Sequence, residues 1–208
     1  MGTTGSSGQG EVRHSPVRAQ LAVVLAILNG ACVSHEARKP SPMRDLHWRS
    51  AGEVRALEIS AILAALHLQN SSAIERVAED SSRGEHFLFA RVRIGAGISW
   101  SQSAFYALPA SPSKPSEVWS GLADEHAASD SFMPVGPYHA TGCLYFGDGP
   151  TLAYFLVLPD TAARSAVEGD TLVRKPGYYE WSGRRFRYSL PADSALAARC
   201  LGSTTPAR

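Results

Sequence analysis

The side chains with the widest chemical repertoire in this chain of 208 residues are its three cysteines, Cys32, Cys143 and Cys200. A cysteine can act as a nucleophile, ligate a metal or form a disulfide. Three cysteines are too few for a four-cysteine zinc site or for a small fold held together by many disulfides. Because three is an odd number, we expect one cysteine to have a role different from that of the other two.

Cys143 ends the run His139-Ala140-Thr141-Gly142-Cys143, and a further histidine, His126, lies upstream. A thiol nucleophile needs a nearby imidazole to take its proton, and a preceding glycine leaves room for substrate. The run resembles the active-site segment of L,D-transpeptidases, periplasmic cell-wall enzymes with His and Gly immediately before the nucleophile, although Thr141 stands where that segment has its His. The resemblance implies a peptidoglycan-directed cysteine enzyme that uses Cys143 with His126 or His139.

A disulfide between Cys143 and Cys200 is the competing interpretation, and it would consume the thiol that the enzyme needs. In the chain-entropy model a bond across this stretch stabilises the fold by roughly 3–4 kcal/mol. Disulfides persist in oxidising compartments such as the bacterial periplasm. We favour the disulfide, which leaves Cys32 as the cysteine with a different role.

Cys32 follows an apolar run of residues 19–31 that ends in small residues and has basic residues before it. A run of this length is too short to span a bilayer, which takes about 20 residues, but fits the apolar part of a secretory signal. Gly30-Ala31-Cys32 resembles the end of a bacterial lipoprotein signal, although Asn29 stands where such signals prefer Leu. The resemblance implies a signal peptide over 1–31 with a long n-region, and fatty acyl chains such as palmitate on Cys32.

The composition excludes several classes of protein. Hydrophobic residues make up 44% and charged residues 19% of the chain, which is enough apolar material for a core and too little charge for a disordered protein. The formal net charge is only +1, so we expect no nucleic-acid partner.

No other residues form a motif for catalysis or for a metal. The seven histidines include no HExxH motif and no pair spaced as i and i+4, so we expect no metal and no cofactor. The segment Gly97-Ile98-Ser99-Trp100-Ser101 lacks the second glycine of a nucleophile elbow, and no histidine is tied to it by spacing. A serine nucleophile is therefore not expected.

The elements that must position these residues divide between helices and strands. Residues 32–49 predict a flexible tether, and 50–202 predict a single domain followed by a disordered tail over 203–208. The capping box Ser50-Ala51-Gly52-Glu53 and the helical spacing after it predict a helix over 51–68, and Ser72-Ala73-Ile74-Glu75 predicts a second one to Glu79. Strands are expected over 85–94, 104–108, 144–146 and 152–158, and short helices after Pro159 and over 193–199.

The interval from Pro109 to Gly142 is rich in Pro and Ser and predicts a long irregular loop with at most one short helix over 116–124. It carries Trp119, Phe132 and Tyr138, apolar side chains that could either cover the sheet or meet a partner. We expect these three residues at a partner-binding surface.

Residues 178–188 predict a β-hairpin with a two-residue turn, Ser182-Gly183. This register pairs Trp181 with Arg184 and Glu180 with Arg185, and it places four aromatic residues on one face, namely Tyr179, Trp181, Phe186 and Tyr188. Arg185 and Arg187 fall on the other face, and they could join Arg91 and Arg93 in one basic patch if the strands are neighbours.

The sequence thus predicts an α+β fold, with one or two N-terminal helices packed on an antiparallel sheet, a long irregular loop and a C-terminal hairpin. The favoured function is a non-catalytic binding or inhibitor module of the bacterial cell envelope, of the immunity or assembly-accessory kind. It would be lipid-anchored through Cys32, face the periplasm and contact an envelope protein through Trp119, Phe132, Tyr138, Arg185 and Arg187. The cysteine enzyme and a structural envelope protein remain as alternatives.

Overall fold

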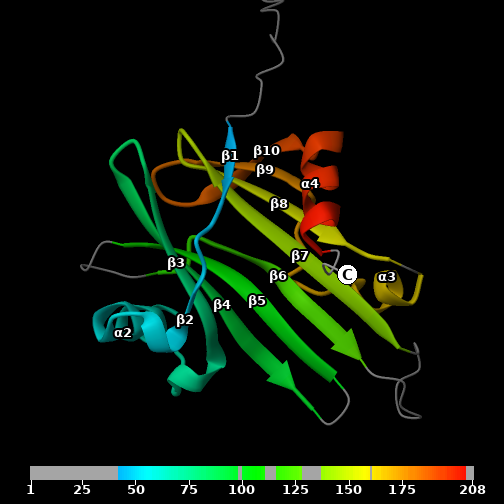
Figure 1. Cartoon of the computed structure of the whole chain (residues 1–208), viewed down its shortest axis with the longest axis horizontal. Coiled ribbons are helices and arrows are strands. Elements are labelled where there is room, and N and C mark those ends of the chain that lie inside the picture. The colour runs from blue at the N-terminus through cyan, green and yellow to red at the C-terminus, as the bar shows by residue number, and fades with distance from the viewer. Residues whose placement is uncertain (1–41, 98–99, 111–115, 128–136, 160, 205–208) are drawn as a thin grey trace, which may run out of the picture. The chain divides into compact units, whose positions relative to one another are not determined.

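The computed structural model describes residues 42–97, 100–110, 116–127, 137–159 and 161–204. Strands account for far more of this part of the chain than helices do (Figure 1). The strands are β1 (Met43–Asp45), β2 (Arg49–Ser50), β3 (Ile74–Ser82), β4 (Glu85–Ala96), β5 (Trp100–Pro109), β6 (Trp119–Ala127), β7 (Tyr138–Gly147), β8 (Thr151–Val157), β9 (Gly177–Trp181) and β10 (Phe186–Pro191). The helices are η1 (Ala51–Glu53), α2 (Ala56–Ala65), η2 (Ser71–Ala73), α3 (Thr161–Val167) and α4 (Ser194–Thr204).

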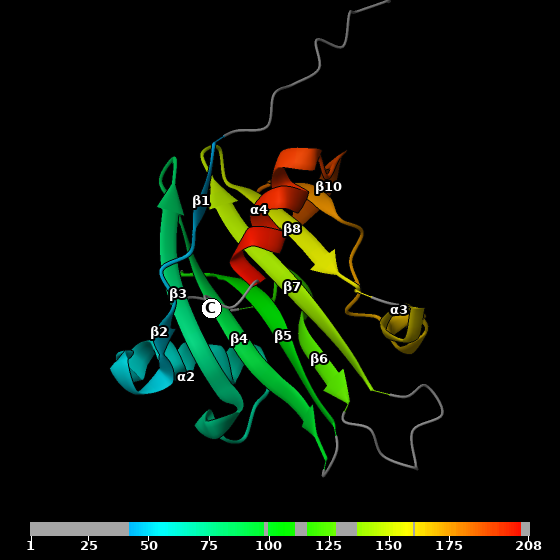
Figure 2. The same cartoon turned by 45° about the vertical axis from the view of Figure 1, so that its right-hand side comes forward.

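The ten strands form one antiparallel sheet in which strands consecutive in the sequence are neighbours from β2 to β10 (Figures 1 and 2). β1 leaves this order and pairs with β7, with Met43 opposite Gly147 and Asp45 opposite Tyr145. A meander of this kind needs tight turns. The β3–β4 turn has positive φ at both central residues, Arg83 (+50°) and Gly84 (+81°), as the right-handed twist of a two-residue hairpin requires.

The main core lies where strands far apart in the sheet order approach one another. The ring of Phe87 on β4 lies 5.7 Å from that of Phe146 on β7, 5.0 Å from that of Trp181 on β9 and 5.1 Å from that of Phe186 on β10. The sheet therefore curls so that β4 faces the C-terminal hairpin across a buried aromatic cluster. Close aromatic pairs of this kind contribute about 0.5–1.5 kcal/mol each beyond the burial of their area.

The two longer helices cover separate smaller clusters. In α2, Ile62 is fully buried against the cluster that contains Val77, Ala90 and Leu108. In α4, Leu196 and Cys200 pack against Tyr145 and other residues of β7 to β9. Cys200 forms a disulfide with Cys143 on β7, as the sequence predicted, so α4 is covalently held to the sheet.

β1 is fastened to its surroundings by two arginines. Arg44 donates to both carboxylate oxygens of Asp80, at 2.9 and 2.7 Å, and to Asp148 at 3.0 Å. Arg199, on α4, donates to the carbonyl oxygen of Met43 at 2.7 Å and to the carboxylate of Asp45 at 2.9 Å. Residues 43–49, which the sequence assigned to the tether, therefore belong to the folded domain.

The predicted α+β architecture is wrong, because the fold is a mostly β, ten-stranded antiparallel sheet with small helices only. The predicted helix over 51–68 consists of the short turn η1 and the ten residues of α2. The capping box is present, since the Glu53 carboxylate accepts from the Ser50 backbone N–H at 2.8 Å and from its hydroxyl at 2.7 Å, but it caps η1 rather than a long helix.

Two further predicted helices are strands. The second capping box does not start a helix, because the Asn70 side chain caps η2 by accepting from the Ser72 N–H at 2.9 Å, and β3 begins at Ile74. The predicted helix over 116–124 and much of the predicted loop are occupied by β6 and the first part of β7. β6 is buried on both faces over Trp119–Ala123, so it lacks the polar–apolar alternation by which a half-buried strand is recognised.

The C-terminal hairpin is confirmed, with a different register. Trp181 pairs with Phe186, and Tyr179 pairs with Tyr188, so the turn has four residues instead of two. The register differs from the predicted one by an even number of residues, which keeps these four aromatic side chains on one face. The predicted signal peptide, Cys32 and Phe132 lie outside the described residues.

Candidate functional site

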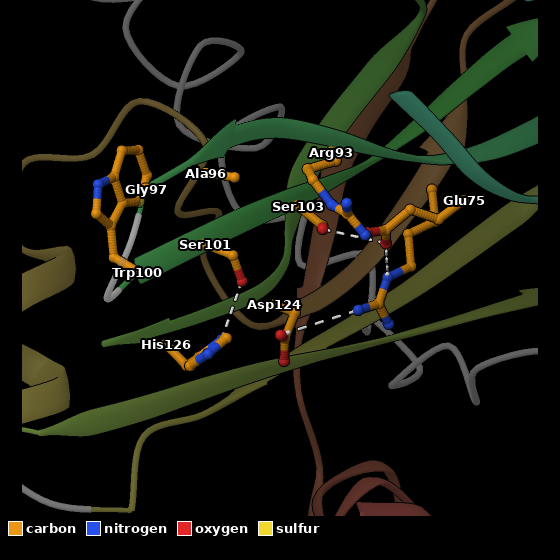
Figure 3. Close-up of a pocket in the computed structure, with 10 residues that line it drawn as sticks. Glu75, Arg93, Ala96, Gly97, Trp100, Ser101, Ser103, Asp124 and His126 are labelled. Carbon is orange, nitrogen blue, oxygen red and sulfur yellow. Dashed lines mark hydrogen bonds and ion pairs between the residues drawn. The ribbon is translucent and has the colours of Figure 1, made fainter. Parts of the chain in front are cut away.

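A polar cavity of about 240 Å³ lies at the end of the β4–β5 hairpin (Figure 3). Its lining comes from four adjacent strands and the residue that follows β4, and comprises Glu75, Arg91, Arg93, Ala96, Gly97, Trp100, Ser101, Ser103, Asp124 and His126. Strand pairing brings these residues together, because Arg93 lies opposite Ser103 and Ser103 lies opposite Asp124. Residues directly opposite on antiparallel strands point to the same face.

The charged groups at one end of the cavity neutralise one another. The Glu75 carboxylate accepts from Arg91 Nε at 2.8 Å and from Arg93 Nε at 3.1 Å, and it also accepts from the hydroxyl of Ser103 at 3.1 Å. Arg91 lies 3.9 Å from the carboxylate of Asp124. The two arginines and two carboxylates thus fix each other in place and leave this end of the cavity with balanced charge.

Two histidines extend this network along β6 and β7. Ser101 Oγ lies 3.0 Å from His126 Nδ1, within hydrogen-bond distance, and Figure 3 shows the two side chains pointing toward each other. His139 Nε2 lies 2.7 Å from the Asp124 carboxylate. A hydroxyl beside an imidazole is the elementary pair of a nucleophile and its base, and it is equally a donor and acceptor pair for a polar ligand.

Trp100 borders the cavity through the start of β5, and its indole lies over two glycines of the hairpin, on the face of the sheet opposite Ser101 and His126. A Cβ atom added to Gly95 would lie 2.5 Å from Trp100 Cη2, and one added to Gly97 would lie 2.5 Å from Trp100 Nε1. The indole therefore lies against the backbone along its whole length, and only glycine at both positions allows this. The Trp100 side chain is still 38% exposed.

A second hollow of about 430 Å³, here called the basic groove, lies beside the C-terminal hairpin. It is lined by Glu117, Val118, Trp119, Arg174, Tyr179, Arg185, Phe186, Arg187 and Tyr188. Three arginines against one glutamate give it an excess of positive charge, and Lys175 Nζ adds to it at 4.5 Å from the centre of the Tyr188 ring.

The wall of the basic groove is held by hydrogen bonds to backbone. Arg174 donates to the carbonyl oxygen of Ser120 at 2.7 Å and to its hydroxyl at 3.1 Å. The hydroxyl of Tyr179 donates to the carbonyl oxygen of Lys175 at 2.6 Å. Burial raises the pKa of Tyr179 to about 12, with Arg174 opposing the rise, so its phenol stays protonated and keeps this hydrogen bond near neutral pH.

The predicted partner-binding residues lie in different environments in the structure. Arg185 and Arg187 are exposed on the basic groove, and Trp119 lines the same groove although it is only 6% exposed. Tyr138 is buried and its hydroxyl donates to Glu125 at 2.7 Å, which leaves it no exposed face for a partner. Arg91 and Arg93 do not join Arg185 and Arg187, because they line the polar cavity and pair with Glu75, whereas Arg185 and Arg187 line the basic groove.

The predicted cysteine nucleophile has no free thiol in this structure. The sulfur of Cys143 is bonded to that of Cys200, under α4. The two histidines considered as its base have other contacts, His126 with Ser101 and His139 with Asp124. The pair of Ser101 and His126 was missed in the sequence, and only the register of β5 against β6 brings it together.

Among the described residues, no three His, Cys, Asp or Glu side chains are grouped so that they could hold a metal ion. Over the same residues, the structure contains no helix with the length and apolar character needed to cross a membrane. Comparison of the chain with protein-family models, with curated proteins and with solved structures finds no match.

Proposed function

We propose that the chain is a non-catalytic binding module of the bacterial cell envelope, anchored by lipid on Cys32, that contacts an acidic surface of a partner protein through the basic groove. The observation that carries the binding part is the composition of the groove. Exposed Arg185 and Arg187, together with Arg174, adjoin the partly exposed ring of Tyr188. Arginine and tyrosine are enriched among the residues that dominate binding energy at protein interfaces.

Support for the compartment comes from the cysteines. The disulfide between Cys143 and Cys200 is of the kind that persists in an oxidising environment. It leaves Cys32, at the end of a lipoprotein-like signal, as the single remaining cysteine. Acyl chains contribute about 0.8 kcal/mol per buried CH₂, so two or more on one cysteine anchor a domain without a spanning helix.

The hairpin suits a partner surface because it is preorganised. The Ser182 hydroxyl donates to the carbonyl oxygen of Arg185 at 2.7 Å across the turn, and the Trp181 ring packs 5.2 Å from that of Phe186 on the core side. Side chains held on a rigid element lose less conformational freedom on binding. The arginines also favour the approach of an acidic surface at long range, an effect that salt weakens.

Photo-crosslinking in intact cells tests the groove. A photoreactive phenylalanine analogue at Tyr188 should give one discrete crosslinked species, which Arg185→Glu combined with Arg187→Glu should abolish. The control carries the same change of charge on exposed arginines outside the groove, Arg83→Glu with Arg164→Glu, and should keep the species. Poly-glutamate should compete in lysed envelopes and poly-lysine should not. A crosslink that survives reversal of the groove charges would contradict the proposal.

The lipid anchor on Cys32 and the alternative of a cysteine enzyme are tested by separate experiments. Labelling with a palmitate analogue and membrane association should both disappear in Cys32→Ala, and unchanged membrane association would refute the anchor. Alkylation of the unfolded, non-reduced chain should modify neither Cys143 nor Cys200. Two reactive thiols there would remove the disulfide and favour the enzyme that uses Cys143 with His126 or His139.

A further inference from the structure

We propose that the cavity beside Trp100 binds a neutral pyranose sugar, with one face of the sugar ring stacked on the indole and its hydroxyls hydrogen-bonded to Ser101, Asp124 and His126. This site shares no residue with the basic groove, so it stands whether or not the groove binds a protein.

The first argument is the position of Trp100. Exposed tryptophans are unusual, and this one is held flat against the backbone by the absence of side chains at Gly95 and Gly97. A flat ring with one face on glycine backbone offers its opposite face to a ligand. A pyranose presents a face of C–H groups to such a ring, and removal of that apolar area from water is favourable.

The second argument is the polar composition of the cavity. Sugar hydroxyls both donate and accept, and the cavity provides both functions, with the Asp124 carboxylate as acceptor and the hydroxyl of Ser101 and the ring of His126 able to do either. Asp124 is already oriented by His139 at 2.7 Å. Figure 3 shows Ser101, His126 and Asp124 between the indole at one end and the Glu75–Arg93 pair at the other.

The third argument concerns charge and size. Glu75 neutralises Arg91 and Arg93 through contacts of 2.8 and 3.0 Å, so the arginines do not present the uncompensated charge that a phosphate or carboxylate would require. The volume of about 240 Å³ lies below the roughly 300–1,000 Å³ typical of sites for drug-sized ligands. A single uncharged ring with several hydroxyls fits these properties.

The test is ¹⁹F NMR of the full chain, purified in detergent and labelled with 5-fluorotryptophan. The four tryptophans give four probes, and Trp100→Phe assigns the one of interest. Glucose, galactose and N-acetylglucosamine are titrated separately, with glucuronate and inorganic phosphate as charged probes. We expect at least one neutral sugar to shift the Trp100 resonance saturably while the other three resonances stay in place.

Matched glycine variants separate the binding site from the fold. Gly97→Ala places a methyl group against the indole, whereas Gly52→Ala adds one in open space. We expect Gly97→Ala to weaken sugar binding by at least about tenfold and Gly52→Ala to leave it unchanged, with the resonances of Trp48, Trp119 and Trp181 reporting an intact fold in both. The proposal is overturned if no neutral sugar shifts the Trp100 resonance, if only glucuronate or phosphate does, or if Gly97→Ala binds as tightly as the parent chain.

Discussion

The buried hydroxyl of Tyr154 on β8 donates a hydrogen bond of 2.9 Å to the backbone carbonyl oxygen of Leu122 on β6. β6 and β8 lie on either side of β7 in the sheet order, so this bond reaches across β7. Gly142 on β7 permits the approach, because a Cβ there would collide with the same carbonyl group of Leu122. Burial also raises the pKa of Tyr154, which keeps the hydroxyl protonated as a donor.

Tyr154→Phe should lower the free energy of unfolding by about 1–3 kcal/mol, because it leaves the Leu122 carbonyl buried with one partner fewer. Urea unfolding followed by far-UV circular dichroism measures the change. Tyr188→Phe removes the same hydroxyl from a ring that is 37% exposed, and should cost less than about 0.5 kcal/mol. Equal costs for the two variants would show that the interior hydrogen bond contributes nothing specific.

Loss of the disulfide should destabilise the domain by roughly 3–4 kcal/mol, because the bond between Cys143 and Cys200 closes a loop with a sequence separation of 57 residues. Unfolding of the double variant Cys143→Ser with Cys200→Ser, compared with the parent chain with and without reductant, measures this. The reduced parent and the double variant should unfold at similar urea concentrations. A double variant as stable as the oxidised parent would refute the prediction.

Glu75→Gln should destabilise the sheet near the cavity by about 1–3 kcal/mol, since it removes the charge that holds Arg91 and Arg93 together on adjacent positions of one face. The cost should shrink at high salt, which screens the repulsion between the two guanidinium groups. Glu168→Gln, an exposed carboxylate after α3, is the control and should be nearly neutral. Chemical unfolding at low and high salt gives both values, and a cost equal to that of the control would count against the role of Glu75.

Stability should fall steeply between about pH 10 and pH 12. Burial raises the folded-state pKa of Tyr178 and of Tyr179 to about 12, with Asp193 adding to the rise at Tyr178, while both phenols titrate near pH 10 when unfolded. The unfolded chain therefore loses these protons first, and the stability present below pH 10 is lost as the pH rises through 12.

Each such tyrosine contributes a slope of about 1.4 kcal/mol per pH unit within that window. Tyr178→Phe should flatten the dependence of the free energy of unfolding on pH, measured by urea titration at a series of pH values. Leu57→Ala, at an exposed side chain that does not titrate, serves as the control and should keep the slope of the parent chain. An identical slope in the two variants would argue against a buried, protonated phenol at Tyr178.

Local patterns allowed parts of the fold to be predicted from the sequence. The hairpin of β9 and β10 was recognised from its alternating side chains and turn residues, and β4, β8 and the end of β7 from their aromatic and β-branched residues beside turn glycines. The pairing of Cys143 with Cys200 followed from counting cysteines. The predicted register of the C-terminal hairpin differs from the observed one by two residues. Its four aromatic residues still share one face, because a shift by an even number of residues leaves every side chain on the same face.

β6 and the polar cavity could not be predicted, because they depend on contacts between residues that are far apart in the sequence. β6 is buried on both faces over Trp119–Ala123, so it lacks the alternation that distinguishes a half-buried strand from a loop or a helix. Ser101 and His126 meet only because β5 and β6 pair in one register, with a bulge at Ser103/Ala104 that sequence spacing does not reveal. Gly95 and Gly97, just before Trp100, are a local signal of a ring that lies on the backbone, but they do not indicate the cavity.

The attachment of β1 has a mechanical consequence. Any pull on the chain from the N-terminal side of Met43 is borne first by the three residue pairs that join β1 to β7 and by the bidentate contact of Arg44 with Asp80. Arg199 passes part of the load from Met43 and Asp45 into α4, which the bond between Cys143 and Cys200 ties back to β7. Tension at the N-terminus is therefore carried into β3, β7 and α4 instead of being borne by β1 alone.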